Sequence, residues 1–288
     1  MRRVNQAARP SKPGFALLPP FRQACCRAQI LPRFFPFGRT PRRDAMSWLD
    51  LPRVPEPEVM DDAGEVQAYS SAAAEEYLGK IDDTFVEHAV RLAGGVAAQK
   101  SPVKFTLRLL DIGTGPGQII LKLAPRLSFW QLLGVDRSPN MIRQAIAAAT
   151  REASRPQPTT AWPFVQFLVA DGARLPFADE SFDLVLSNSV LHHLAHPAAF
   201  LAEIARIVKP TGAVLVRDLR RPSRIAYNLH VRTHGRHYSG LMYKLYCDSV
   251  RSAYTEHELS AMLQTAKFPR VRVFTLGRTH LGFERPAG

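Results

Sequence analysis

Three glycines spaced two residues apart follow a mainly apolar run, and this stretch constrains the fold more than any other part of the sequence. Leu107 to Ile112 suits a buried strand, Gly113-Thr114-Gly115-Pro116-Gly117 suits a tight turn, and Ile119 to Leu127 has the apolar spacing of a helix. Glycines let the backbone turn sharply and approach a ligand, and the amides that open the next helix face a polar ligand group. The stretch therefore predicts the start of a nucleotide-binding βαβ layout.

The spacing of the glycines separates two classes of nucleotide-binding protein. A dinucleotide-binding G-x-G-x-x-G turn would need its third glycine at Gln118, which disfavours a NAD-linked oxidoreductase. Asp111 to Gly117 instead matches D-x-G-x-G-x-G, and later segments match the same family in order between Leu107 and Pro269. The chain thus resembles the class I S-adenosylmethionine-dependent methyltransferases, in particular the small-molecule enzymes of the ubiquinone/menaquinone type.

The resemblance implies a fold, an activity and a cofactor. The fold would be an α/β three-layer sandwich, with a Rossmann-like, mostly parallel sheet of seven strands whose last strand is antiparallel. The activity would be transfer of a methyl group from S-adenosyl-L-methionine to a small-molecule acceptor that is anionic or aromatic. An RNA methyltransferase and a non-catalytic cofactor-binding protein are the alternatives, so a nucleic acid is the less favoured partner.

An acid follows the second predicted strand, Gln131 to Val135, where such units bind ribose. Gly113 and Asp136 are separated by close to the roughly 20 residues expected between a glycine loop and a ribose-binding acid, although Asp136 is also suited to cap a helix. After the third strand, Phe164 to Ala170, Asp171-Gly172 resembles the family's adenine-binding turn, and an ordinary Asp-Gly turn is its alternative. The resemblance assigns cofactor binding to Asp111, Gly113, Thr114, Gly115, Gly117, Asp136, Arg137, Met141, Asp171, Gly172 and Asn188.

The fourth predicted strand ends at Asn188, and Leu191-His192-His193-Leu194 follows it. In the family this strand end faces the donor methyl group. Methyltransferases of nucleobase nitrogens or glutamine amides often carry Asn/Asp-Pro-Pro-Tyr there, and Ser189-Val190-Leu191 argues against such acceptors. A histidine can take a proton from an acceptor near neutral pH, and packing beside the cofactor is the alternative for both histidines. The candidate catalytic residues are His192, His193 and Asp218, the last at the end of the fifth predicted strand.

Residues 219–254 are predicted to form a substrate-cap insertion. Leu219 to Cys247 contains no acid and interleaves basic side chains with tyrosines, which suits an anionic or aromatic molecule or a phosphate backbone. A solvated helical face is the alternative. The candidate acceptor residues are Arg224 and Tyr227 in this segment, and Tyr69 in an N-terminal segment that often covers the cofactor in the family or packs on a helix. His230, His234 and His237 could share a helix face and bind a metal, but no carboxylate lies nearby in sequence, so no metal is predicted.

Further elements complete the expected sheet and its helices. Apolar spacing predicts a helix over 78–93 that stops at Gly94-Gly95, and a later helix that stops at Lys209-Pro210-Thr211-Gly212 before a strand from Ala213 to Arg217. Thr255 to Glu258 forms a capping box for a helix that ends at Ala266. Residues 271–276 and 280–284 are the expected closing strands.

Charge is distributed unevenly along the 288 residues. Residues 1–45 hold ten basic residues and one acid, which gives +9 of the total +13. Residues 1–46 are predicted to be a disordered tail, with an organelle transit peptide, a nucleic-acid-binding arm, or translated sequence upstream of a true start at Met46 as interpretations. Residues 47–288 would form the methyltransferase domain. Three cysteines without a disulfide or zinc pattern, and no membrane-length apolar run, favour a cytoplasmic protein.

Overall fold

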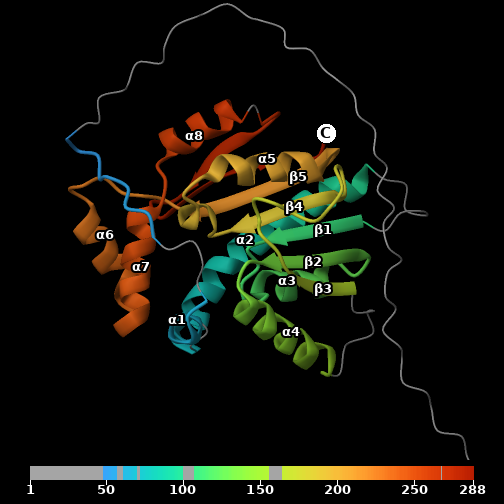
Figure 1. Cartoon of the computed structure of the whole chain (residues 1–288), viewed down its shortest axis with the longest axis horizontal. Helices are drawn as coiled ribbons and strands as arrows, with labels where there is room; N and C mark the ends of the chain where they lie inside the picture. The colour runs from blue at the N-terminus through green and yellow to red at the C-terminus, as the bar shows by residue number, and fades with distance from the viewer. Residues whose placement is uncertain (1–47, 57–60, 70–71, 100–106, 156–163, 267) are drawn as a thin grey trace, which may run out of the picture. The chain divides into compact units, whose positions relative to one another are not determined.

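The computed structural model describes residues 48–56, 61–69, 72–99, 107–155, 164–266 and 268–288 (Figure 1). All of these residues belong to one compact unit that extends from Met46 to Gly288. The predictions made for residues 1–46 lie outside the described residues. Among the described helices, none combines the length and the apolar character needed to cross a bilayer.

Seven strands in the described part of the chain form one sheet in the order β3-β2-β1-β4-β5-β7-β6. The first five strands pair in parallel, whereas β7 pairs antiparallel with both β5 and β6. This topology confirms the predicted α/β sheet with an antiparallel last strand. The strands are β1 (Leu107–Ile112), β2 (Trp130–Asp136), β3 (Phe164–Val169), β4 (Phe182–Asn188), β5 (Val208–Leu219), β6 (Arg272–Leu276) and β7 (His280–Arg285).

Helices cover both faces of the sheet. One face packs on α2 and α3 and the other on α5 and α8, while α6 and α7 stand beyond the end toward which the arrows of β1 and β4 point (Figure 1). The described helices are α1 (Ala63–Tyr69), α2 (Ala72–Ala98), α3 (Gln118–Leu123), η1 (Ala124–Arg126), α4 (Pro139–Ala153), η2 (Leu191–His193), α5 (Pro197–Ile207), α6 (Tyr227–His234), η3 (Gly235–His237), α7 (Gly240–Ser252) and α8 (Glu256–Thr265).

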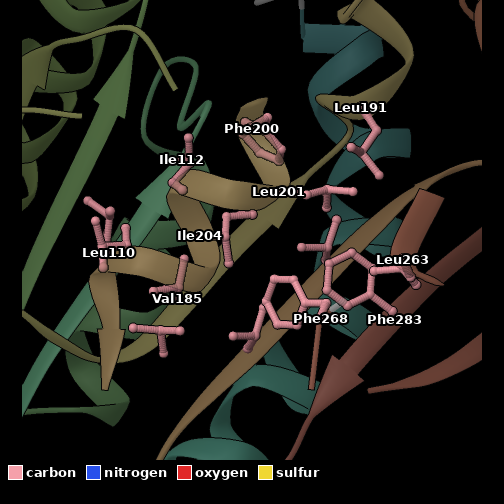
Figure 2. Packing of buried hydrophobic residues seen from close by; sticks show 14 of the residues in the cluster. Leu110, Ile112, Val185, Leu191, Phe200, Leu201, Ile204, Leu263, Phe268 and Phe283 are labelled. Carbon is pink, nitrogen blue, oxygen red and sulfur yellow. The ribbon is translucent and has the colours of Figure 1, made fainter. Parts of the chain in front are cut away.

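The larger hydrophobic core lies between the sheet and helices α5 and α8. Phe200 and Ile204 of α5 are fully buried, and Figure 2 shows them beside buried side chains of β1 and β4. Phe268 and Phe283 pack edge to face, with ring centroids 5.5 Å apart. Burial of each such side chain stabilises the fold by about 1.5–3 kcal/mol, so this core holds the strand ends in fixed register.

Helix α2 continues through Gly94 and Gly95, so the predicted stop there is wrong. Both glycines are exposed, and a Cβ at either would meet no atom within 4 Å. The next residue, Val96, is buried in the core. Each glycine in a helix lowers stability by about 1 kcal/mol relative to alanine. Burial of the Val96 side chain offsets this loss, so the helix extends past Gly94 and Gly95.

Strand β5 begins at Val208, five residues earlier than predicted. Val208 pairs with Phe182, and the register then shifts so that Leu184 pairs with Ala213. Helix α5 ends at Ile207, just before Lys209-Pro210-Thr211-Gly212 as predicted, but this segment lies inside the strand as an irregularity. The capping box is confirmed, since the Thr255 side chain and Glu258 satisfy each other's backbone amides at the start of α8.

Candidate functional site

A cavity of about 670 Å³ lies at the carboxyl ends of β1, β2 and β4, the place where parallel α/β sheets bind ligands. The loop after β1 and the ends of β2 and β4 form one side of its wall. Helix α7 and the segment before it supply Tyr238, Met242, Leu245 and Tyr246 to the wall. The cavity therefore extends from the glycine loop to the predicted cap.

The glycine loop adopts a backbone that only glycine takes without strain. Gly113, Gly115 and Gly117 have φ values of 74°, 54° and 84°. A Cβ on Gly113 would lie 2.2 Å from Val190 Cγ2, whereas a Cβ on Gly115 would meet no atom within 4 Å. Gly113 is thus needed for packing, and Gly115 leaves open space for a ligand. Gly117 lies outside the cavity wall and precedes α3 as its N-cap.

Asp111, at the end of β1, presents a buried carboxylate to the cavity. Its Oδ2 and the Thr114 hydroxyl have no hydrogen-bond partner among the described residues. Burial raises the pKa of Asp111 to about 7. A buried carboxylate oxygen without a partner is costly, and an ammonium group would satisfy it. These two groups and the open space at Gly115 could receive a ligand that carries an ammonium group.

Asp136, the last residue of β2, connects its strand to the glycine loop. Its Oδ2 accepts a hydrogen bond from the Gly115 amide and its Oδ1 accepts one from the Ser138 amide, both at 2.9 Å. Burial raises the pKa of this carboxyl. Ser138, and not Asp136, caps α4, because its side chain accepts from the Met141 amide. The N-cap alternative for Asp136 is therefore wrong, and its carboxylate faces the cavity.

Arg137, Met141, Asp171 and Gly172 form the neighbouring part of the cavity wall. Asp171 Oδ1 accepts a hydrogen bond from the Ala173 amide at 2.9 Å, and the Asp171 carbonyl accepts one from Arg174. This carboxylate thus holds its own turn and still lines the cavity. The structure brings these four residues to the same side as Asp136.

Asn188, at the end of β4, is held by a buried ionic group that sequence analysis missed. Asn188 Oδ1 accepts from Arg217 Nε at 2.9 Å, and Arg217 also donates to the Thr84 hydroxyl at 2.8 Å. Burial lowers the pKa of Arg217 to about 10 and raises that of Asp82, 4.0 Å from it, to about 6. Asp82 and Asn188 both line the cavity. Arg217 therefore holds Asn188, at the end of β4, in place without lining the cavity itself.

His192 and His193 lie next to each other in η2 with ring centroids 4.2 Å apart. His192 Nδ1 lies 2.5 Å from Asp218 Oδ1, and the His192 amide donates to Asp218 Oδ2 at 3.0 Å. Burial alone would lower the pKa of His192, but the charge and hydrogen bond of Asp218, with the charge of Glu56, outweigh it and raise that pKa. Asp218 is buried and does not line the cavity itself, whereas His192 and Leu219, which both bond to its carboxylate, do.

Glu56 lies in residues 48–56, the lead-in segment before α1, and joins this cluster although sequence analysis gave it no role. Its Oε1 lies 3.1 Å from His193 Nδ1 and 3.4 Å from His192 Nε2, and it accepts from the Ser249 hydroxyl at 3.3 Å. Burial raises the pKa of Glu56, while the charge of His192 opposes this. The donor atoms of Glu56, His192 and His193 all lie within 4.8 Å of one another.

Residues 110–216 match the sequence model of the family described as "Methyltransferase domain". The chain is 30% identical over 209 residues to the demethylmenaquinone methyltransferase of Thermus thermophilus, a match that covers 68% of this chain and 89% of that enzyme. The chain belongs to the class I S-adenosylmethionine-dependent methyltransferases. The enzyme is also 33% identical over 116 residues to an uncharacterized methyltransferase of Schizosaccharomyces pombe, over 40% of this chain and 41% of that protein.

Solved structures support the fold of this methyltransferase. The plantazolicin methyltransferase BpumL, solved with a triazolic desmethylPZN analogue and SAH, gives a TM-score of 0.52 at 15% identity, over 76% of this chain and 93% of that chain. At this identity the likeness concerns the fold alone. The cofactor of the methyltransferase is S-adenosylmethionine, as predicted.

Most of the predicted site residues of the methyltransferase line one cavity, but Gly117, Asp218, Arg224 and Tyr227 do not. Arg224 is exposed and its amide donates to the Leu49 carbonyl, and the Tyr227 hydroxyl donates to the Cys247 carbonyl at 3.3 Å. Neither lines the cavity, so the structure does not support their predicted acceptor roles. Tyr69 ends α1, and its side chain lies outside the described residues. On α7, Tyr246 lines the cavity and Tyr243 does not.

The histidines of the cap separate in the structure. His230 and His234 of α6 contact each other as tilted rings with centroids 4.8 Å apart, while His237 is exposed in η3. Burial lowers the pKa of His230 to about 4. His234 lines the cavity of the methyltransferase, where it joins the wall made by the cap.

Proposed function

We propose that the methyltransferase acts on a small aromatic molecule that carries an ionisable hydroxyl group. The proposal rests on the side chains that the predicted cap, residues 219–254, contributes to the cavity wall; this part of the wall is called the cap wall. Tyr238 and Tyr246, with ring centroids 5.3 Å apart, line the cavity together with Met242 and Leu245. Such side chains bury and stack on a flat apolar molecule. His193 lies on the same cavity and supplies a group able to accept a proton.

The proposed cofactor half of the cavity is the one built on β1, β2 and β4. Asp111 and Thr114 would hold the methionine part, Asp136 the ribose and Asp171 the adenine, while Gly115 lets the backbone approach. Bound S-adenosylmethionine supplies an electrophilic methyl group on a sulfonium. The residues of the chain contribute mainly by holding the acceptor atom in line with that methyl group, since alignment supplies much of the rate of such a displacement.

Relatives support an aromatic acceptor at a coarse level. The Thermus thermophilus relative is named as a demethylmenaquinone methyltransferase, and a Trichormus variabilis protein 35% identical over 115 residues is named as a 2-phytyl-1,4-naphtoquinone methyltransferase. Both names describe acceptors with a fused aromatic ring. A cap built from tyrosines and apolar side chains suits the same chemistry in this chain.

The test is methyl transfer by the full-length protein from radiolabelled S-adenosylmethionine to defined probes. The probes are 1,4-naphthohydroquinone and catechol, an aliphatic carboxylate of similar size, and unmodified transfer RNA. Transfer to the hydroxylated aromatics alone supports the proposal. Transfer to the RNA alone would favour the nucleic-acid alternative, and S-adenosylhomocysteine binding without any transfer would favour a non-catalytic protein.

Two tyrosines on the same helix provide a matched pair of variants. Tyr246 lines the cavity and Tyr243 does not. Tyr246→Ala should raise KM for the aromatic acceptor roughly 10-fold, the effect of losing a ring contact worth about 1–1.5 kcal/mol. Tyr243→Ala should leave that KM unchanged. Equal effects of the two substitutions would contradict an acceptor site at the cap wall.

A further inference from the structure

Two adjacent histidines and a glutamate from a distant part of the chain bring three metal-ligating atoms together beside the cavity. We propose that Glu56, His192 and His193 bind one divalent transition metal ion, and that zinc is the ion that best matches two imidazoles and one carboxylate. Because Glu56 stands far from the histidines in sequence, no spacing motif indicates the site. The prediction that no metal binds was argued from the histidines of the cap, and this cluster lies elsewhere.

The separations between the three ligand atoms suit one shared ion. Glu56 Oε1 lies 3.4 Å from His192 Nε2 and 3.1 Å from His193 Nδ1. Zinc binds imidazole nitrogen and carboxylate oxygen at about 2.0–2.1 Å, so two ligand atoms of a tetrahedral site lie about 3.3–3.4 Å apart. All three atoms lie within 4.8 Å of one another, and side-chain rotation is enough to bring the two nitrogens to the same separation. Glu56 and His193 Nδ1 form no hydrogen bond with each other, so an ion between them displaces none.

Asp218 orients His192 for metal binding. His192 Nδ1 lies 2.5 Å from Asp218 Oδ1, and the His192 amide donates to Asp218 Oδ2 at 3.0 Å. A carboxylate at Nδ1 favours the tautomer that has its proton there, which leaves a lone pair on Nε2, the nitrogen on the side of Glu56. Histidines that bind metals are usually oriented by such a carboxylate. The Ser249 hydroxyl in turn donates to the Glu56 carboxylate at 3.3 Å.

The cluster is buried and rich in negative charge. The side chains of Glu56, His192 and Asp218 are 9%, 4% and 2% exposed. Arg53 lies nearby, but its hydrogen bonds go to three backbone carbonyls and its guanidinium stacks on the Tyr254 ring. Two buried carboxylates are costly unless cations balance them, and a divalent ion supplies that balance.

Backbone contacts on two sides fix the lead-in segment that carries the glutamate. The Val54 amide donates to the Arg251 carbonyl of α7 at 3.1 Å. Arg53 donates to the Ser252 carbonyl at 2.6 Å and to the His192 carbonyl at 2.9 Å. The segment is thus attached both to α7 and to η2, so the fold itself holds the carboxylate against the histidines.

An ion at this site would act on a ligand in the cavity. His192 and His193 both line the cavity, and three protein ligands leave the fourth position of a tetrahedral ion open. An oxygen bound to zinc loses its proton far more readily than in water. This role rests on the proposed acceptor with an ionisable hydroxyl, whereas binding of the ion does not. When bound, the ion takes the place of His193 as the group that promotes loss of the acceptor proton.

The proposed step balances with the acceptor and the cofactor alone. The acceptor oxygen binds the ion and gives its proton to solvent, and its electron pair forms the new bond to the methyl carbon. The bond between sulfur and methyl breaks with its electron pair on sulfur. S-adenosylhomocysteine and the methylated acceptor result, and the ion is unchanged.

The first test measures metal binding and needs no acceptor. Full-length protein, stripped with a chelator and dialysed, is titrated calorimetrically with zinc, cobalt(II) and magnesium chlorides. Zinc and cobalt should each bind at one equivalent with a Kd of about 1 μM or tighter, and magnesium, which prefers oxygen ligands, should not bind. The cobalt protein should show visible d–d bands without the charge-transfer band of a thiolate ligand. Absence of saturable zinc binding, or a thiolate band, would overturn the inference.

Variants locate the ion. Glu56→Leu and Glu56→Gln each remove one ligand and should weaken zinc binding about 100-fold or more, and Glu56→Gln keeps the side-chain shape if Glu56→Leu does not fold. Asp218→Asn, which alters the support of His192, should weaken it about 10-fold or more. His234→Asn, a cavity histidine of the cap, is the matched control and should bind zinc like the wild type. Calorimetric titration with S-adenosylhomocysteine verifies that each variant is folded. Unchanged zinc affinity in the Glu56 variants, or its loss in His234→Asn, would overturn the site.

The last test concerns turnover of the aromatic acceptor. Removal of the metal should lower kcat about 10-fold or more, and one equivalent of zinc should restore it in the wild type but not in Glu56→Gln. An unchanged kcat after metal removal would overturn the role of the ion in the loss of the acceptor proton. If no probe is methylated, the proposed function fails, while the zinc titrations still decide whether the site binds a metal.

Discussion

Asp136 Oδ2 accepts a hydrogen bond from the backbone amide of Gly115 at 2.9 Å, so the end of β2 holds the glycine loop that follows β1. Asp136 ends β2 and Gly115 lies in the loop after β1, and these two strands pair in parallel from Leu107 to Ile112. The carboxylate thereby has two roles, since it shapes the loop and also lines the cavity. A change at either residue affects both the loop and the ligand.

Asp136→Ala should weaken binding of S-adenosylmethionine and S-adenosylhomocysteine at least 100-fold. The variant loses the carboxylate proposed for the ribose hydroxyls and leaves the Gly115 amide without its acceptor, and the two losses together amount to about 3 kcal/mol. Isothermal titration calorimetry on the folded protein checks this. Glu256→Gln, an exposed acid in α8, is the control and should bind both ligands normally. Undiminished affinity in Asp136→Ala would remove Asp136 from the cofactor site.

Two glycines of the same loop should respond differently to substitution. Gly113→Ala should lower the free energy of unfolding by about 2–4 kcal/mol, because a Cβ would lie 2.2 Å from Val190 Cγ2 in a backbone with φ of 74°. Gly115→Arg should cost only about 1 kcal/mol of backbone strain, because no atom lies within 4 Å of the added Cβ.

The large side chain in Gly115→Arg should instead occupy the cavity and abolish S-adenosylmethionine binding. Urea unfolding and calorimetric titration of both variants measure the two effects separately. A Gly113→Ala protein as stable as the wild type, or a Gly115→Arg protein that still binds the cofactor, would contradict this division of roles.

The meeting of the strand-end residues in one cavity was predictable because their signals are local. Asp111 to Gly117 and Asp136 each occupy the end of a strand, and parallel strands bring their ends to one edge of the sheet. The position of each residue at the end of a predicted parallel strand is therefore enough to place these residues together. The acceptor side depends on how α6 and α7 rotate and on where the lead-in attaches. No local pattern separates Tyr246 from Tyr227, and Glu56 stands in a proline-rich stretch with no periodicity.

Cofactor binding should be coupled to a proton on Asp111. Burial raises the pKa of this carboxyl to about 7, so it is mainly protonated at pH 6 and mainly ionised at pH 8. The ammonium group of the methionine part favours the ionised form. Affinity should therefore rise with pH, by up to about 10-fold per unit below pH 7, and binding at pH 6 should release close to one proton.

Calorimetry of S-adenosylhomocysteine binding at pH 6 in two buffers of different ionisation enthalpy measures this proton. The observed heats should differ in wild type and agree in Asp111→Asn, which cannot ionise. Equal heats in the wild-type protein would show that Asp111 keeps its protonation state on binding.

His280 should make the native state sensitive to acid. It is buried at the start of β7, where Nδ1 lies 2.8 Å from the Thr279 hydroxyl, and burial, reinforced by the charge of Arg217, lowers its pKa to about 3. In the unfolded chain its pKa is the ordinary value of about 6.5. Above pH 6.5 both states are neutral and the group has no effect. As the pH falls below 6.5, the unfolded state binds a proton that the native state does not, so stability decreases until the pH reaches about 3.

The loss from this one residue is roughly 2 kcal/mol at pH 5 relative to neutral pH. The variant His280→Asn keeps a polar atom near Thr279 but has no proton to bind. Urea unfolding should be followed between pH 5 and 8. As the pH falls, the free energy of unfolding should decrease less steeply in the variant than in the wild type, and above pH 7 the two proteins should show the same slope. Parallel curves over the whole range would mean that His280 titrates alike in the native and unfolded chains, and acid sensitivity would then have to come from other buried groups, such as His230.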